Sequence, residues 1–328
     1  MRLIFMGTPE FAVPTLERLV HDGREIVAAF TQPDKPAGRG KKLNAPPVKL
    51  AAESHGIPVY QPARIKANEE VRAVFEEAAA DACIVAAYGK ILPEWLLRIP
   101  RLGCINVHAS LLPRYRGAAP INWVIANGER ETGITIMQMD AGMDTGPLLA
   151  TRAIHIGERE TASQLSIRLS QLGADVLSET LPKIEQGRIT PIAQDNAQAT
   201  YAPILKREDG LIDVKLTGQE ISNRVRAFEP WPGVFTTFRG QRLMIRRAEE
   251  SQARPEYRIG SVISIDHSGI RAACAEQTAL LILELQIEGK RRMSAWDFAN
   301  GMRLRQGDDL FGCVSPMNGS SANVSGEA

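Results

Sequence analysis

The N-terminal half of the sequence alternates short apolar runs with helical patterns. Apolar runs at 2–6 and 25–31 enclose a segment in which leucines recur at helical spacing. A strand, a helix and a second strand in this order form a βαβ unit, which places the two strands parallel in one sheet. The run at 81–87 is apolar throughout, as in a strand that is covered on both faces. These features predict an α/β fold with a Rossmann-like, mostly parallel sheet.

The second half of the sequence has a different pattern. One helical segment, at 218–228, comes first. Short apolar runs separated by glycines and polar turns follow it, at 234–238, 242–247, 260–264, 270–273 and 280–287. Short strands at regular spacing are typical of a small barrel, so we expect a C-terminal β-barrel of the OB-like kind.

These patterns divide the chain into four parts. Residues 1–188 are expected to form the catalytic domain, and the polar stretch 189–204 is interpreted as a linker. The β-barrel domain is expected at 205–314. The Gly/Ser-rich tail at 315–328 has few apolar residues and is expected to be disordered.

Composition excludes several classes of protein. The 328 residues are 44% hydrophobic and carry a net charge of +1, so any attraction to nucleic acid must come from a local cluster. The four cysteines form no Cys-x-x-Cys pair and no spacing typical of a metal site, which fits a reducing compartment. No apolar run is long enough for a membrane span, and no signal peptide precedes the first strand. We therefore expect a cytoplasmic protein without a metal.

A polar pair ends the apolar run at 102–107. Asn106 and His108 are two residues apart, and residues at this spacing on a strand point to the same side of the sheet. Asp144 follows in a turn flanked by glycines. An amide, an imidazole and a carboxylate that meet in one cleft could hold an oxyanion, move a proton and orient the imidazole. A hydrogen-bonded structural histidine and a turn-capping aspartate are the alternatives.

The first strand is followed by too few glycines for a dinucleotide site. Such a site requires Gly-x-Gly-x-x-Gly between strand and helix, and only Gly7 is present. A nicotinamide-dependent oxidoreductase is therefore disfavoured.

A long basic loop follows the second strand. Its prolines and glycines argue against regular structure. Between Asp34, its one acid, and residue 49 it carries five basic residues: Lys35, Arg39, Lys41, Lys42 and Lys49. Such a loop at the strand-end side of a sheet could bind phosphates, although a charge run is often only a solvated face.

Several longer segments resemble the folate-dependent formyltransferases. They are FMGTPEFAVPTL, FTQPDKPAGRGKK, VAAYGKILP, LGCINVHASLLPRYRGAAPINW, ETGITIMQMDAGMDTG and RAFEPWPGVFT. The resemblance extends to about Gly312. The second and last of these segments are more specific to the family members that act on initiator tRNA.

The resemblance implies a reaction and a set of residues. A formyl group would move from 10-formyltetrahydrofolate, as co-substrate, to the α-amine of methionine on initiator tRNA, with no metal or nicotinamide. Asn106, His108 and Asp144 match the catalytic positions. The folate-contacting segment is matched by Ser110, Leu111, Leu112 and Pro113.

The partners implied are folate and initiator methionyl-tRNA. Contacts with the tRNA are expected from Lys35, Arg39, Lys41, Lys42, Lys206, Arg207, Lys290, Arg291 and Arg292. We expect a monomer that does not bind membranes. Another formyltransferase, acting on glycinamide ribonucleotide or an amino-sugar nucleotide, is the first alternative, and a non-catalytic RNA-binding protein is the second.

Overall fold

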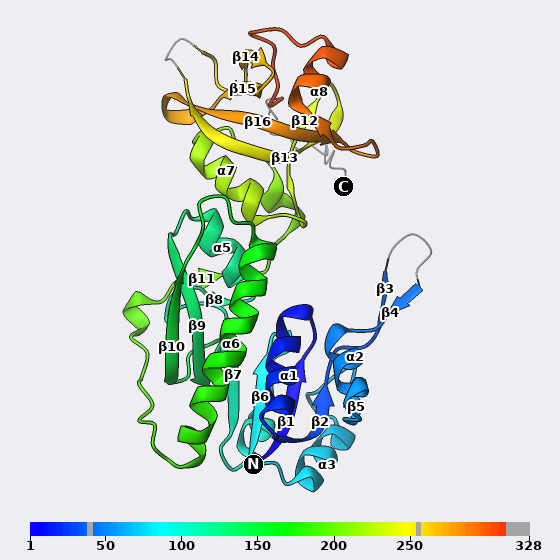
Figure 1. Ribbon diagram of the computed structural model, residues 1–328, viewed down its shortest axis with the longest axis vertical. Helices are drawn as coiled ribbons and strands as arrows, with labels where there is room; N and C mark the ends of the chain where they lie inside the picture. Colours follow the sequence, from blue (N-terminus) through cyan, green and yellow to red (C-terminus); the bar gives the residue numbers. More distant parts are fainter. Residues whose placement is uncertain (38–41, 254–256, 313–328) are drawn as a thin grey trace, which may run out of the picture. The chain divides into compact units, whose positions relative to one another are not determined.

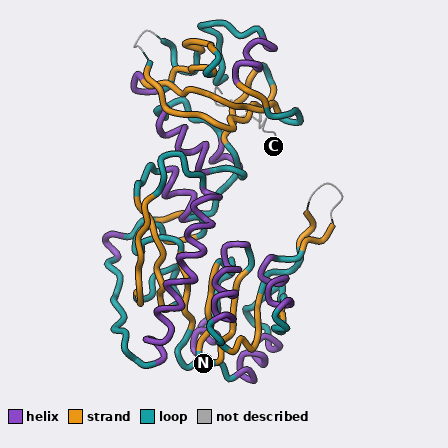
Figure 2. Tube along the Cα trace, in the orientation of Figure 1, coloured by secondary structure: helices purple, strands orange, loops and turns teal. Residues whose placement is uncertain are grey.

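A computed structural model describes residues 1–37, 42–253 and 257–312 of the chain (Figure 1). The chain divides into two compact units, of which the first is Met1–Leu205 and the second begins at Lys206. Helices and strands alternate in the first unit, whereas strands predominate in the second (Figure 2).

A seven-stranded sheet forms the centre of the first unit, in the order β10-β9-β7-β6-β1-β2-β5 (Figure 1). Its strands are β1 (Arg2–Gly7), β2 (Glu25–Phe30), β5 (Val59–Tyr60), β6 (Ala82–Ala86), β7 (Cys104–His108), β9 (Glu131–Gln138) and β10 (Leu148–His155). The strands from β7 to β5 run parallel, β9 pairs antiparallel with β7, and β10 pairs antiparallel with β9 at the edge of the sheet. The predicted mostly parallel sheet is confirmed.

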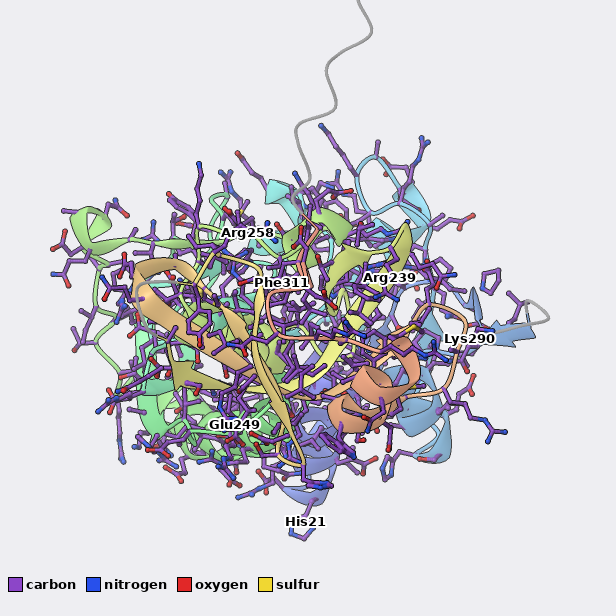
Figure 3. All side chains as sticks on the ribbon, turned by 90° about the horizontal axis from the view of Figure 1, so that it is seen from above. His21, Arg239, Glu249, Arg258, Lys290 and Phe311 are labelled. Carbon is purple, nitrogen blue, oxygen red and sulfur yellow. The ribbon has the colours of Figure 1, made fainter. Side chains whose placement is uncertain are left out.

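The helices of the first unit connect and cover these strands. They are α1 (Val13–His21), α2 (Pro47–Ser54), α3 (Glu69–Ala78), α4 (Glu94–Arg98), α5 (Pro120–Ala126) and α6 (Ala162–Glu185), with 3-10 turns η1 (Glu10–Ala12) and η2 (Asn196–Gln198). The start of α6 is fixed by a capping box, in which Thr161 and Gln164 bond to each other's backbone N–H groups. His21, at the end of α1, is exposed as expected (Figure 3).

Close packing of α6 on the sheet depends on one glycine. A Cβ at Gly173 would lie 2.7 Å from Cγ1 of Val107, which is closer than van der Waals contact allows. Val107 points away from its neighbours Asn106 and His108, because side chains alternate along a strand. The glycine therefore lets α6 approach the strand that carries both polar residues.

The basic loop forms a hairpin, contrary to the expectation of no regular structure. β3 (Lys35–Ala37) and β4 (Lys42–Asn44) pair antiparallel, with Pro36 opposite Leu43. Proline is tolerated here because a two-stranded ribbon consists only of edge strands. Arg39 and Lys41 lie outside the described residues.

The stretch 189–204, interpreted as a linker, belongs to the first unit. β11 (Tyr201–Ala202) pairs parallel with β8 (Arg116–Gly117), and Ile192 exchanges two backbone hydrogen bonds with Leu148. The domain boundaries drawn from the sequence stay a prediction, as does the disordered tail, which lies outside the described part of the chain.

The second unit contains antiparallel strands, as predicted. Its sheet runs in the order β12-β13-β16-β15-β14, and β17 pairs with β16. The elements are α7 (Gly218–Ala227), β12 (Val234–Phe238), β13 (Gln241–Gln252), β14 (Val262–Asp266), β15 (Gly269–Ala273), β16 (Thr278–Ile287), β17 (Met293–Ser294) and α8 (Ala295–Met302), with 3-10 turns η3 (Arg207–Gly210) and η4 (Ala275–Gln277). Trp231 is 55% exposed, whereas the neighbouring Phe228 is fully buried.

We predict that Gly173→Ala and Gly301→Ala change stability in opposite directions. Alanine favours a helix over glycine by up to about 1 kcal/mol, but overpacking costs about 1–3 kcal/mol. Gly173 has no space for a methyl group, whereas Gly301 in α8 has open space around it. The melting temperature should therefore fall for Gly173→Ala and rise for Gly301→Ala. A rise for both variants would show that α6 can move away from β7 at no cost.

Candidate active site

A cavity of about 540 Å³ opens where the parallel strands β6 and β7 end. Ligands of α/β proteins bind at this edge of the sheet. Its lining is mostly apolar and consists of Pro9, Phe11, Val85, Ala87, Tyr88, Gly89, Lys90, Asn106, Val107, His108, Ala109, Gly117, Ala118, Ala119, Pro120, Ile121, Asn122, Met139, Met143 and Asp144. The cavity therefore brings together Asn106, His108 and Asp144, the three residues that the sequence singled out.

Asn106 and His108 reach the cavity from β7. In the sheet, Asn106 lies between Val85 of β6 and Met137 of β9. Only 8% of Asn106 and 6% of His108 is exposed. Among the described residues no hydrogen bond engages the Asn106 side chain, so its amide is available to a ligand in the cavity.

The imidazole of His108 lies between two hydrogen-bond acceptors. Its Nε2 is 3.1 Å from the backbone oxygen of Tyr115. Because a carbonyl oxygen only accepts, Nε2 carries a hydrogen. Its Nδ1 faces the carboxylate of Asp144, with 3.8 Å between Nδ1 and Oδ1. This distance suits an ion pair and is too long for a direct hydrogen bond.

The carboxylate of Asp144 is held by its surroundings. Gly117 donates its backbone N–H to Oδ2 at 2.8 Å, and the side-chain amide of Gln194 donates to the backbone oxygen at 2.9 Å. The φ of Asp144 is +53°, a left-handed conformation that few residues other than glycine adopt. Asp140, in contrast, accepts hydrogen bonds from Gly142 and Thr145 and is a turn residue.

Sequence reasoning did not identify the loop after β6 as part of the site. Burial raises the pKa of the Tyr88 phenol well above its usual range, and its hydroxyl has no hydrogen-bond partner in the described structure. Lys90 donates to the backbone oxygens of Pro62 and Ala63, and burial lowers its pKa. The sequence did contain an indication of this loop's position, because Tyr88-Gly89-Lys90 directly follows the apolar run at 81–87 and so lies at the end of a buried strand.

The structure does not place the predicted folate segment in the cavity lining. Ser110 donates to the backbone oxygen of Arg114, and the backbone N–H of Leu112 donates to Thr135. Neither these two residues nor Leu111 and Pro113 line the cavity. Folate contact by these four residues stays a prediction.

The two arginines near this segment differ in their surroundings. Arg114 is half-exposed and pairs with Glu129. Arg116 is only 2% exposed and is therefore not a surface residue. Its guanidinium is directed inward because Gln194 and Asn196 supply acceptors there.

The residues predicted to contact tRNA fall into three groups. Lys35, Lys206, Arg207, Lys290 and Arg291 are exposed, and Lys290 is labelled in Figure 3. Arg292 is exposed but pairs with Glu284 and Glu229, which neutralise its charge. Arg39 and Lys41 are outside the described ranges, and the side chain of Lys42 is not described either. Phosphate contact by all nine residues stays a prediction.

The second unit contains a cationic group that the sequence did not reveal. The guanidinium of Arg242 lies 3.6 Å from the ring centroid of Phe235 and 3.7 Å from the carboxylate of Glu288. Burial lowers the pKa of Arg242, and the nearby charges of Arg207 and Arg246 lower it further. The charges of Arg207 and Arg246 therefore repel that of Arg242, an arrangement that an anion would stabilise.

Known protein families match both units. The Formyl transferase family matches residues 1–181, and the family described as Formyl transferase, C-terminal domain, matches residues 204–303. Together with the sheet and its strand-end cavity, these matches define the class of protein as a formyltransferase.

Curated relatives narrow this class. A methionyl-tRNA formyltransferase of Geobacter metallireducens is 53% identical over 94% of this chain and 97% of its own length. One of Koribacter versatilis is 49% identical over 94% of this chain and 98% of its own length. The chain belongs to the methionyl-tRNA formyltransferase family. It transfers a formyl group to the methionine of initiator methionyl-tRNA, and the family uses formyl-tetrahydrofolate as donor.

A solved structure shares the fold at low sequence identity. The N-formyltransferase from Helicobacter canadensis, in complex with folinic acid and dTDP-3-aminofucose, is 18% identical and has a TM-score of 0.63. The match covers 85% of this chain and 98% of that one.

No group of three His, Cys, Asp or Glu side chains among the described residues could hold a metal ion. No helix there has the length and apolar character needed to cross a membrane.

We predict that removing the hydroxyl of Tyr88 does not destabilise the protein. A buried hydroxyl without a partner costs about 1–3 kcal/mol, so Tyr88→Phe should melt at the same or a higher temperature. Tyr115→Phe is the matched control, because the hydroxyl of Tyr115 donates to Glu129 at 2.8 Å and accepts from Asn127 at 3.2 Å. This control should lose about 1 kcal/mol. Equal losses in calorimetry for the two variants would contradict the assignment of an unpaired phenol.

Proposed function

We propose that Asn106, His108 and Asp144 carry out the formyl transfer inside the cavity. The observation that supports this role is the position of His108 between the carbonyl of Tyr115 and the carboxylate of Asp144. A ring with a hydrogen on each nitrogen would donate to the carbonyl of Tyr115 and form an ion pair with Asp144, and such an imidazolium is a strong donor. The free amide of Asn106 lies on the same side of the same strand.

The chemistry needs donors where negative charge develops. When the α-amine of methionine attacks the formyl carbon, the formyl oxygen gains charge. Donors fixed in advance in a water-poor site stabilise such charge more than water does. We assign this task to the amide of Asn106 and the Nδ1–H of His108. No nucleophilic side chain is required, because a neutral amine is itself a nucleophile.

Asp144 is the proposed acceptor of the amine's proton. The new C–N bond forms as the amine loses one proton, and N10 of 10-formyltetrahydrofolate gains one as its bond to the formyl carbon breaks. The carboxylate of Asp144 can accept the first proton, directly or through a water. His108 can donate the second, and the transfer of a proton between the two side chains then restores the pair. The bonds and the protons of this scheme balance without a metal.

The cavity fits the donor that the family uses. Its walls are mostly apolar and its polar groups few, as in sites for flat heterocyclic ligands. Asn106, His108 and Asp144 are together at one part of the lining. We therefore expect the formyl group to lie against these three residues and the pterin ring against the apolar wall.

In the second unit we propose that cationic residues bind phosphates of the tRNA. Lys206 and Arg207 are exposed, and the charges of Arg207 and Arg246 both repel that of Arg242. Phosphates would relieve this repulsion. Lys290 and Arg291 form no ion pair with described residues, so they too can bind a phosphate without losing a protein partner. The monomeric state stays a prediction.

We predict that His108→Ala and Asp144→Asn each reduce turnover by about 10²-fold or more, the scale of acid–base and oxyanion groups. Asn tolerates a left-handed backbone and can still accept the N–H of Gly117, so Asp144→Asn should fold normally. Asp140→Asn is the matched control in the same turn and should retain turnover. The measurement is the rate of formyl-methionyl-tRNA formation by folded variants. Near-normal rates for Asp144→Asn would exclude a role for its charge.

We also predict different salt dependences for neighbouring basic residues. Log affinity falls as log salt rises, and each lost phosphate contact makes this slope shallower by about 0.7–0.9. Lys290→Ala combined with Arg291→Ala should therefore weaken tRNA binding and flatten this slope by up to about 1.5. Arg292→Ala should leave the slope unchanged, because its charge is already paired. Binding of formyl-tetrahydrofolate serves as the control and should stay constant. An unchanged slope in the double variant would exclude these two residues as phosphate contacts.

A further inference from the structure

The segment 192–202, which we call the strap, contacts the backbone on both sides of His108. It contains η2 and β11, and Ile192 anchors its first end by two backbone hydrogen bonds to Leu148. β11 anchors its other end on β8. Between these anchors its polar groups bond to the segments that supply the two acceptors of the His108 ring.

At one end the strap holds Tyr115. The hydroxyl of Thr200 accepts the backbone N–H of Tyr115 at 2.9 Å. The backbone oxygen of Thr200 accepts the N–H of Arg116, also at 2.9 Å. Tyr115 has a φ of +59°, which is unfavourable for a large side chain unless its neighbours enforce it. Its carbonyl can accept from Nε2 of His108 only while this conformation is kept.

Near its other end the strap holds Asp144. The amide nitrogen of Gln194 donates to the backbone oxygens of Asp144 at 2.9 Å and Gly146 at 2.7 Å. These two bonds cross-link the turn in which Asp144 adopts its left-handed conformation. The direction in which the carboxylate faces Nδ1 of His108 therefore depends on a residue fifty positions later in the chain.

Arg116 fixes the orientation of Gln194. Its Nε and Nη2 donate to Oε1 of Gln194 at 3.1 and 2.7 Å, and Nη2 also donates to Oδ1 of Asn196. A guanidinium only donates and a carbonyl only accepts, so the amide of Gln194 can satisfy both neighbours in one orientation only. This buried cation forms no ion pair with the described carboxylates, and its contacts on the strap are neutral acceptors.

We propose that the strap is a positioning device for the formyl transfer, with Gln194 and Thr200 as positioning residues. Gln194 holds the carboxylate that faces Nδ1 of His108, and Thr200 holds the carbonyl that faces Nε2. Neither residue lines the cavity. The inference rests on the proposed roles of His108 and Asp144, because a strap that positions residues without a part in the reaction would have no effect on turnover.

Gln194→Glu is the sharpest test of the Asp144 side. A carboxylate keeps its acceptors for Arg116 but has no hydrogen to donate to the oxygens of Asp144 and Gly146. We expect kcat to fall by about 10–100-fold, the scale of a small misplacement of a catalytic group, with KM for both substrates within a few-fold. The pH profile of kcat should shift, since the carboxylate beside His108 has moved.

Gln198→Glu is the matched control on the same segment. Gln198 is exposed and bonds only to the side chain of Asp195, at 2.9 Å, and to its backbone. The control makes the same change of charge without touching the catalytic turn. Its kcat and pH profile should equal those of the wild type.

Thr200→Ser and Thr200→Ala test the Tyr115 side. Serine keeps the hydroxyl and should retain kcat, whereas alanine should lower it by about 10-fold or more. A loss of kcat with a shifted pH profile in Gln194→Glu, and rescue by serine at 200, would support the strap. Unchanged kcat, or a loss without any shift and without rescue, would overturn it. If His108→Ala is also fully active, the proposed function fails as well; if His108→Ala is inactive, only the strap is excluded.

Discussion

The orientation of one buried ring is the constraint on which the first unit depends. His108 directs Nδ1 toward the carboxylate of Asp144 while Nε2 donates to the carbonyl of Tyr115. That carbonyl and the facing carboxylate of Asp144 come from two loops, and both residues have left-handed backbone conformations. Such conformations persist only where surrounding contacts enforce them. The sheet supplies the position of the ring, and the loops around it supply the orientation.

The elements that the sequence predicted well are those with strong periodicity. The apolar runs of β1 and β6 and the leucine pattern of α1 identify buried elements directly, because burial dictates their residue types. The spacing of Asn106 and His108 placed both on one side of a strand by geometry alone. The glycines mark a turn that contains two aspartates, and the resemblance to the formyltransferases indicated Asp144.

The parts that the sequence could not predict depend on contacts between distant segments. Gln194 lies in a polar stretch without periodicity, and its role exists only because Arg116 and the turn at Asp144 fold onto it. The proximity of Arg207 and Arg246 to Arg242 could not be predicted for a related reason. Net charge and local runs of charge do not show which strand positions a sheet places side by side. For the same reason the sequence did not show that Glu284 and Glu229 lie beside Arg292 and reduce the positive charge of the Lys290–Arg292 run.

The place of the strap in the chain bears on how this enzyme can be divided. The match to the Formyl transferase family ends at residue 181, whereas the first compact unit extends to Leu205. A fragment cut at the end of α6 would retain Asn106, His108 and Asp144 and the whole sheet. It would lack every hydrogen bond that Gln194 and Thr200 supply to the loops around the ring. Fusion or domain-exchange boundaries therefore belong after Ala202, beyond the strand that pairs with β8.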